Sequence, residues 1–298
     1  MFKKLSKLEK YLLKLRDREA YNNYKFILRL QSAPIPNFAV PAGNDIHFKH
    51  SGHTGDIIYS LPTMYALAEN KNIHLHLHTH QNSNNKKLTH PLGSLMLTEK
   101  IVDLLKPLLL HQPAIKTCDV YYEQTVHYDL DVFRQYPFNY KIGHIARWYF
   151  LAFGINADLG KPWLQAPADV SMNNTIIIAR SQRYRNAAID YSFLRKYQRL
   201  VFVGLEQEYT DMKMMLPNIE YRVVKDFLEL SSLIAGCRFF IGNQSFPFSL
   251  AEGLKVKRLL EVYPQSPNVI VEGANGYDFC YQPQFEKLVA DLYEKTAN

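Results

Sequence analysis

Short apolar runs that alternate with helical segments constrain the fold of this 298-residue chain more than any other feature. Two of them, Thr175–Ala179 (TIIIA) and Arg199–Val203 (RLVFV), have the length of strands and are apolar through their centres. Strands of this kind are typical of parallel sheets that helices cover on both faces. The sequence therefore predicts an α/β protein.

The alternation occurs in two halves and predicts two Rossmann-like, doubly wound parallel-sheet domains facing a cleft. Strands are expected at 46–49, 73–79, 118–122, 130–133, 175–179, 199–203, 238–241 and 258–262. Helices are expected at 57–69, 95–110, 144–153, 191–197, 228–236, 247–253 and 285–295. Residues 45–170 would form the N-terminal domain and 171–298 the C-terminal domain, with 162–174 as a linker. Ligands of such folds bind at the carboxyl ends of the strands.

The basic residues are concentrated at the N-terminus. Residues 1–30 contain nine lysines and arginines and three acids, a net charge of +6 in a chain whose total is +7. Leucines recur at helical spacing, so residues 2–30 are predicted to form one amphipathic helix, and prolines make the rest of 1–44 a linker. The helix would either pack on the body or attach to an anionic membrane surface or a partner. The near-neutral remainder argues against nucleic-acid binding.

Cysteine content and hydropathy indicate the cellular compartment. The three cysteines are widely spaced and form no CxxC pair, so a disulfide framework or a zinc finger is not expected. No apolar run approaches the roughly 18 residues that span a bilayer. We therefore expect a cytoplasmic protein, with peripheral contact to a membrane as the alternative that the N-terminal helix suggests.

The segment His50–Pro62 (HSGHTGDIIYSLP) follows an expected strand and opens an expected helix. Gly52 and Gly55 permit a tight turn. Asp56 would lie near the helix N-terminus, where it could take a proton from an attacking hydroxyl or serve only as a cap. His50 and His53 are candidates for contacts with an acceptor or with a donor phosphate.

The longer segment HSGHTGDIIYSLPTMYAL resembles the N-terminal signature of the heptosyltransferase family, glycosyltransferase family 9, through Gly55, Asp56, Leu61 and Pro62. The resemblance implies the two-domain GT-B fold. It also implies inverting, metal-independent transfer of a hexosyl- or heptosyl-type sugar from a nucleotide-sugar donor, with Asp56 as the general base. A role in glycan or lipopolysaccharide biosynthesis, with a glycan or lipid-linked acceptor and no further cofactor, would follow.

A second segment, Leu228–Leu254, resembles the donor-site block of that family in its order of helix, strand, loop and helix start, but its loop residues differ. Asn243, Gln244 and Ser245 stand at the Asp-Thr/Ser-Gly positions, and the family's histidine has no counterpart. A loop at a helix N-terminus offers backbone N–H groups and hydroxyls to phosphates. The alternative is a plain connection between a strand and a helix.

A third segment, Ala179–Asn186 (ARSQRYRN), directly follows a buried strand. The resemblance implies that its serine and basic residues hold the donor diphosphate, because guanidinium groups suit phosphate binding and no metal would be present. The predicted ligands are Arg180, Ser181, Arg183 and Arg185, with an ordinary basic loop as the alternative. Glu206, after the next strand, could hydrogen-bond a ribose.

The run Ile73–His80 (IHLHLHTH) places four histidines on one face of a strand. Adjacent pairs could chelate zinc, but no carboxylate or cysteine lies close in sequence. We therefore expect a polar-faced or edge strand, and no metal site.

The sequence as a whole predicts a nucleotide-sugar-dependent glycosyltransferase. Two rivals share the fold: a non-catalytic nucleotide- or sugar-binding protein, and another nucleotide-sugar enzyme such as an epimerase. Nucleic-acid binding through the basic helix is a third alternative, which the neutral body disfavours.

Overall fold

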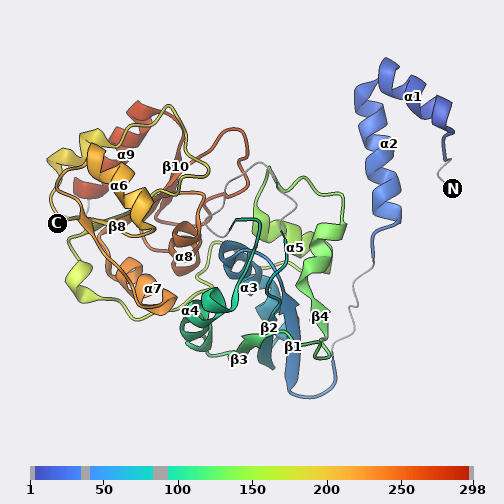
Figure 1. Cartoon of the computed structure of the whole chain (residues 1–298), viewed down its shortest axis with the longest axis horizontal. Coiled ribbons are helices and arrows are strands. Elements are labelled where there is room, and N and C mark those ends of the chain that lie inside the picture. The colour runs from blue at the N-terminus through green and yellow to red at the C-terminus, as the bar shows by residue number, and fades with distance from the viewer. Residues whose placement is uncertain (1–3, 35–40, 83–92, 295–298) are drawn as a thin grey trace.

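A computed structural model describes residues 4–34, 41–82 and 93–294, and it contains two parallel β-sheets (Figure 1). The first has the order β3-β2-β1-β4 and the second the order β10-β9-β8-β5-β6-β7. Their strands are β1 (Asp45–His50), β2 (Asn72–Leu77), β3 (Ile115–Val120), β4 (Tyr128–Asp129), β5 (Ile176–Ala179), β6 (Leu200–Phe202), β7 (Glu220–Tyr221), β8 (Phe239–Asn243), β9 (Arg258–Glu261) and β10 (Gly276–Phe279). The predicted α/β class with two parallel sheets is confirmed.

Helices alternate with these strands along the chain. The first sheet is accompanied by α3 (Thr54–Ala68), α4 (Glu99–Leu110) and α5 (Ile145–Phe153), and the second by α6 (Glu206–Met215), α7 (Phe227–Gly236), α8 (Phe246–Leu254) and α9 (Gln282–Glu294). Within the described ranges, no helix is long and apolar enough to cross a membrane.

The C-terminal sheet is buried on both faces, as its apolar runs predict. In β5, Ile177 and Ala179 belong to a core shared with α7 and α8. Ile176 and Ile178 belong to a second core, to which α9 contributes Phe285. Successive side chains of a strand point to opposite faces, so both faces of this sheet are packed.

The N-terminal sheet has one apolar face and one polar face. In β1, Ile46 and Phe48 are fully buried, whereas the alternate residues His47 and Lys49 are partly exposed. The sequence predicts helices on both faces of this sheet. The second face is instead polar and partly exposed, because the sequence of β1 alternates apolar and polar residues. The prediction of a polar-faced histidine strand is confirmed in β2, which lies inside the sheet and not at its edge.

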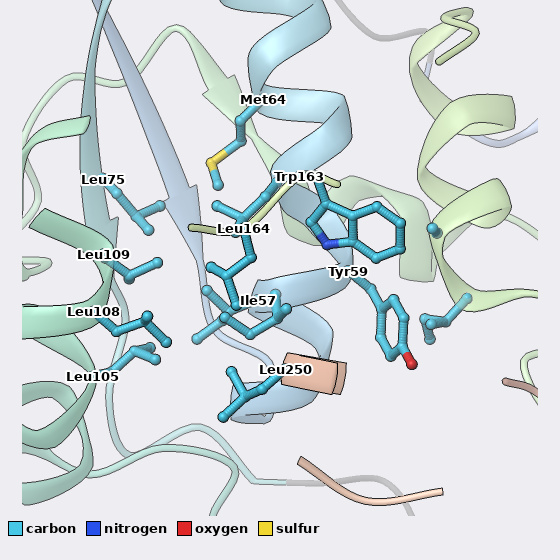
Figure 2. Packing of buried hydrophobic residues seen from close by; sticks show 14 of the residues in the cluster. Ile57, Tyr59, Met64, Leu75, Leu105, Leu108, Leu109, Trp163, Leu164 and Leu250 are labelled. Atoms are coloured by element: carbon cyan, nitrogen blue, oxygen red, sulfur yellow. The ribbon is translucent and has the colours of Figure 1, made fainter. Parts of the chain in front are cut away.

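The two halves share one continuous core. Helix α3 packs against both α5 and α8, and α4 packs against α7. Figure 2 shows Ile57 of α3 and Leu250 of α8 beside Trp163 and Leu164, from the connection between the sheets. The backbone N–H groups of Trp163 and Leu164 both donate to the Gly253 carbonyl, at 3.0 and 3.2 Å. This packing brings the start of α3 close to the start of α8.

The N-terminal segment is two helices where the sequence predicts one. Helix α1 covers Lys7–Arg16 and α2 covers Arg18–Gln31. Asp17 breaks the helix because its backbone is extended, and its carboxylate accepts a hydrogen bond from the Ala20 N–H at 2.9 Å. An aspartate in this role caps a new helix and does not continue the old one. In Figure 1 both helices lie to one side of the body.

Several other elements differ from the prediction. The expected strand at 130–133 is a 3₁₀ helix, η1 (Leu130–Gln135), which the Asp129 side chain caps through the Asp131 N–H. The expected helix at 191–197 is a 3₁₀ turn, η3 (Ser192–Lys196). The mostly polar helix α6 and the short strands β7 and β10 were not predicted, since none has a long apolar pattern.

Candidate active site

Asp56 lies in the first turn of α3, directly after the carboxyl end of β1. Its side chain is 26 % exposed. His53 precedes the helix in an extended conformation but makes no side-chain cap. A carboxylate in the first turn is stabilised by the helix dipole. The position of Asp56 at this end of the sheet is the one expected from the sequence.

Arg134 of η1 is the ionic partner of Asp56. Its Nη2 lies 3.4 Å from Asp56 Oδ2, and its Nη1 donates to Asp131. Asp131 in turn accepts from the Ser51 N–H at 3.2 Å. Burial alone would lower the pKa of Arg134, but Tyr149, Asp56 and Asp131 raise it overall. The guanidinium therefore stays charged and ties the turn after β1 to η1.

Sequence reasoning missed Arg134 and Asp131. Asp131 lies in the expected strand at 130–133 and Arg134 directly follows it, and a strand directs residues three apart to opposite faces. In the helical turn that forms instead, residues three apart share a face and form the ion pair. The aspartate at 129, a capping residue, is the signal that could have revealed the turn.

Gly52 leaves the space that Arg134 occupies. A Cβ at this position would lie 2.4 Å from Arg134 Nη2, 2.6 Å from His50 Cε1 and 3.0 Å from Asp56 Oδ2. Those separations are shorter than van der Waals contact, so any larger residue must displace the guanidinium or the imidazole. The turn therefore favours glycine at position 52, because glycine has no Cβ to occupy this space.

His50 is fully buried and holds the turn from within. Its Nδ1 accepts from the Gly52 N–H at 2.8 Å, and its Nε2 lies 2.7 Å from the hydroxyl of Tyr149 on α5. Burial lowers the pKa of His50 to about 4. The neutral ring must therefore carry its proton on Nε2 and donate it to Tyr149. The predicted contact of His50 with an acceptor or a phosphate is not compatible with this position.

His53 is better placed for such a contact, because it is only partly buried. Burial lowers the pKa of His53, the Asp56 carboxylate opposes the shift, and the charge of Arg183 adds to it. Tyr184 feels the same two charges: burial and Asp56 raise its pKa, and Arg183 lowers it. The loop at 183–184 therefore lies within electrostatic reach of the Asp56 turn.

The first turns of α3 and α8 abut at Gly55. A Cβ on Gly55 would lie 3.9 Å from both the Phe246 Cα and the Ser249 Oγ of α8. Ser245 is the residue before α8, so the segments predicted for acceptor and donor meet at this contact.

Arg180 does not face this meeting point. Its guanidinium makes two hydrogen bonds to the buried Glu261 carboxylate, at 2.7 and 2.8 Å, and donates to the carbonyls of Asn186 and Ile189. The side chain is 7 % exposed and lies over the ring of Tyr191, 4.6 Å from its centre. The structure therefore corrects the assignment of Arg180 to a donor diphosphate: its bonds hold β5 and β9 together.

The other two arginines of this loop differ from each other. Arg185 donates to Asp211 at 2.8 Å and to the carbonyls of Ser181 and Arg180, so it too serves the fold. For Arg183, the structure gives no carboxylate partner within residues 4–34, 41–82 and 93–294, and its guanidinium lies 5.6 Å from the ring centre of Tyr184. The anion contact of Arg183 stays a prediction, whereas Arg180 and Arg185 are bonded within the fold.

Asn243 and Ser181 shape the same loop. Asn243 Oδ1 accepts from the Ser181 N–H at 3.0 Å, and its Nδ2 donates to the carbonyls of Ser181 and Arg183, at 2.9 and 2.7 Å. Ser181 Oγ donates to the Arg183 carbonyl. These side chains position the backbone around Arg183, and the donor contact predicted for Ser181 and Asn243 stays a prediction.

Gln244 and Ser245 also bond within the fold. Gln244 accepts from the Tyr263 N–H at 2.8 Å and donates to the Ser266 carbonyl and the Asn268 side chain, both at 2.7 Å. Ser245 Oγ donates to the Asn243 carbonyl at 3.2 Å. Gln244 is thus bonded within the fold through both ends of its amide, and the phosphate contact of the half-buried Ser245 stays a prediction.

Glu206 is exposed and is the first residue of α6, shortly after the end of β6. The buried carboxylate in this segment is Glu208, which accepts from the backbone N–H groups of Gln182 and Leu205, at 3.2 and 3.1 Å. Burial raises the pKa of Glu208. The ribose contact of Glu206 stays a prediction.

The histidines of β2 meet further histidines on the polar face of the first sheet. His47 Nδ1 lies 2.9 Å from His76 Nε2, and the ring of His47 stacks on His74 at 4.7 Å between ring centres. His80 lies apart and pairs with Glu99 at 2.8 Å. Within the described ranges, no three histidine, cysteine or acidic side chains are grouped so that they could hold a metal ion.

Solved structures with a similar fold include glycosyltransferases. A family 9 glycosyl transferase from Veillonella parvula has 12% identity and a TM-score of 0.52, over 85% of this chain and 89% of its own. The E. coli heptosyltransferase WaaC with ADP has 9% identity and a TM-score of 0.53, over 83% and 99%. The E. coli ADP-heptose LPS heptosyltransferase II has 11% identity and a TM-score of 0.51, over 85% and 100%.

No family model and no curated protein matches the sequence. At identities near 10%, a shared structure establishes the fold and not the reaction. The chain therefore has the GT-B fold of these heptosyltransferases, and helices α3 and α8 from its two halves meet beside the turn that carries Asp56.

Proposed function

We propose that this protein transfers a sugar from a nucleotide-sugar donor to a hydroxyl of a glycan or lipid-linked acceptor. The observation that carries the proposal is the placement of Asp56: partly exposed, at a helix N-terminus, where the first turn of α3 meets that of α8. The fold, shared with heptosyltransferases, supports it. The acceptor would bind on the side of the N-terminal domain, residues 45–170, and the donor on the side of 171–298.

Asp56 is the proposed general base. The structure describes an ion pair for Oδ2 only, so Oδ1 is the oxygen expected to take the proton of the acceptor hydroxyl. Arg134 holds the carboxylate in position, and an oriented base is effective because the proton transfer needs a short, directed contact. The hydroxyl oxygen then attacks the sugar carbon opposite the leaving diphosphate, which inverts that carbon.

Arg183 is the proposed cation for the diphosphate. The first turn of α8 would supply backbone N–H groups from Phe246 and Phe248, since Pro247 has none. With no metal in the proposed reaction, these groups would have to stabilise the charge that develops on the leaving group. We expect no nucleic acid in this reaction and propose the cytoplasm as its compartment.

One observation favours a second candidate, a nucleotide- or sugar-binding protein without catalysis. Arg180 is bonded to Glu261 of β9, and Asn243 and Gln244 are bonded to the protein's own loops. A donor site with so few free polar side chains would bind a nucleotide sugar through backbone groups and Arg183 alone.

A screen of nucleotide sugars separates the two candidates. Release of a nucleoside diphosphate that requires both protein and acceptor supports transfer. Thermal stabilisation by a nucleotide sugar without turnover, over a range of acceptors, supports the binding protein. A donor at ~100 times its Kd stabilises by about 2.7 kcal/mol, which a melting curve detects. Absence of both effects would contradict both candidates.

A further inference from the structure

Helix α1 carries an apolar stripe that faces away from the rest of the protein. Leu8, Tyr11, Leu12 and Leu15 are spaced three and four apart, so they share one face of the helix. Their exposed fractions are 67, 59, 39 and 65 %. Exposure of four large apolar side chains on ten residues is unfavourable unless something covers them.

The opposite side of α1 is the one that holds the helical hairpin together. Tyr24 of α2 is buried, and its hydroxyl accepts from the Leu5 N–H at 2.8 Å. Lys10 lies 6.0 Å from the ring centre of Tyr24, and Leu13 is half-buried. Ser6 caps the start of α1, and Asp17 ends α1 and caps the start of α2, so neither helix boundary depends on the stripe. The stripe is therefore not needed to form the hairpin.

Basic side chains border the stripe. On a helical projection, Lys7 and Lys14 lie along one edge and Arg16 along the other. Residues 4–31 contain eight lysines and arginines and three acids, a net charge of +5. An apolar face bordered by lysine and arginine fits the boundary between anionic headgroups and acyl chains. A protein partner would need a matching acidic rim around an apolar groove.

We propose that α1 lies flat on an anionic phospholipid surface. The stripe enters the boundary between headgroups and acyl chains, and Lys7, Lys14 and Arg16 contact the phosphates. At ten residues, α1 is too short to span a bilayer, so it lies on the surface. The inference does not depend on the proposed sugar transfer, and it narrows the membrane contact expected of residues 2–30 to one face of α1.

Co-sedimentation of the full-length protein with vesicles tests the proposal. We expect binding to vesicles of equimolar phosphatidylglycerol and phosphatidylcholine, and much weaker binding to phosphatidylcholine alone. The triple variant Leu8→Ser, Leu12→Ser, Leu15→Ser should bind at least about a hundredfold more weakly, because each leucine contributes burial on the membrane. Circular dichroism and a melting curve check that the variant folds.

Two further variants sharpen the result. Met214→Ser with Val223→Ser removes two apolar side chains that are equally exposed, 71 % each, outside the hairpin, and should bind as the parent does. Lys7→Gln with Lys14→Gln and Arg16→Gln keeps the stripe and should weaken binding about fivefold per residue, with the remaining binding less sensitive to salt.

Three results would overturn the proposal. The first is equal binding to neutral and anionic vesicles. The second is unchanged binding of the folded leucine variant. The third is a dimer, seen by sizing at increasing concentration, that the leucine variant abolishes while the parent ignores vesicles. That last result would assign the stripe to a second copy of the chain.

Discussion

The two polar segments that meet between α3 and α8 differ in what their side chains bond to. On the N-terminal side, Asp56 has one described partner, Arg134 at 3.4 Å, and remains partly exposed. On the C-terminal side, Asn243 makes shorter bonds to the loop at 181–183, and Arg180 makes shorter bonds to Glu261 of β9. A polar residue at the end of a parallel strand is thus available for chemistry in the first case and serves the fold in the second.

The largest expected effect tests the structural role of Arg180. Arg180→Ala leaves the Glu261 carboxylate buried without its partner, which should lower the free energy of unfolding by about 3–5 kcal/mol. Arg183→Ala, in the same loop, should change it by no more than about 0.5 kcal/mol. Urea denaturation measures both. Similar losses for the two variants would remove the distinction between them.

The pH dependence of stability tests the buried turn. The pKa of His50 is about 4 in the folded protein and near 6.5 when exposed, so folding favours the neutral ring. The stability that the neutral His50 ring contributes is fully present above pH 6.5. It is lost as the pH falls toward 4, which lowers the free energy of unfolding by an amount on the order of 3 kcal/mol. His144, with a pKa of about 3, acts in the same direction.

The variant His50→Gln shows how much of the pH-dependent loss of stability comes from His50. The variant should be less stable at pH 7 but should lose less stability between pH 6.5 and 4 than the parent. Unfolding curves at several pH values give both quantities. An unchanged slope would mean that His50 does not titrate in this window.

A third prediction concerns the residue at position 243. Asn243→Asp restores the residue that the resemblance to family 9 leads one to expect, and a carboxylate still accepts from the Ser181 N–H. It cannot donate to the carbonyls of Ser181 and Arg183, which should cost about 1–3 kcal/mol. Chemical denaturation measures the loss. A stabilised variant would favour a ligand-binding role for this position.

The smallest expected changes in stability distinguish Gly52 from Gly55, the two glycines of the turn that carries Asp56. Gly52→Ala places a Cβ 2.4 Å from Arg134 Nη2 and should cost about 1–3 kcal/mol. Gly55→Ala has ordinary 3.9 Å contacts in the first turn of a helix and should be neutral or stabilise by up to about 1 kcal/mol. Melting curves compare them, and a reversed order would contradict the described packing of Arg134.

Most of the apolar strands and helices and the position of Asp56 could be predicted from the sequence, because they follow from apolar patterns and from one local motif, whereas the mostly polar α6 and the short strands β7 and β10 could not. The partners of the polar residues could not. Arg134 and Asp56 are 78 residues apart, and Arg180 and Glu261 are 81 apart, so no local pattern links them. The break at Asp17 was missed because the apolar spacing continues through it and only the cap reveals it.

The central claim is that Asp56 accepts the proton of the acceptor hydroxyl. Once a donor and acceptor are identified, the most direct measurement is the transfer rate of Asp56→Asn together with its donor affinity by calorimetry. Asp119→Asn, an exposed aspartate of β3, is the control. We expect Asp56→Asn to lose about 10²–10⁴-fold in kcat while the donor Kd stays within a few-fold. Transfer at the parent's rate would contradict the account.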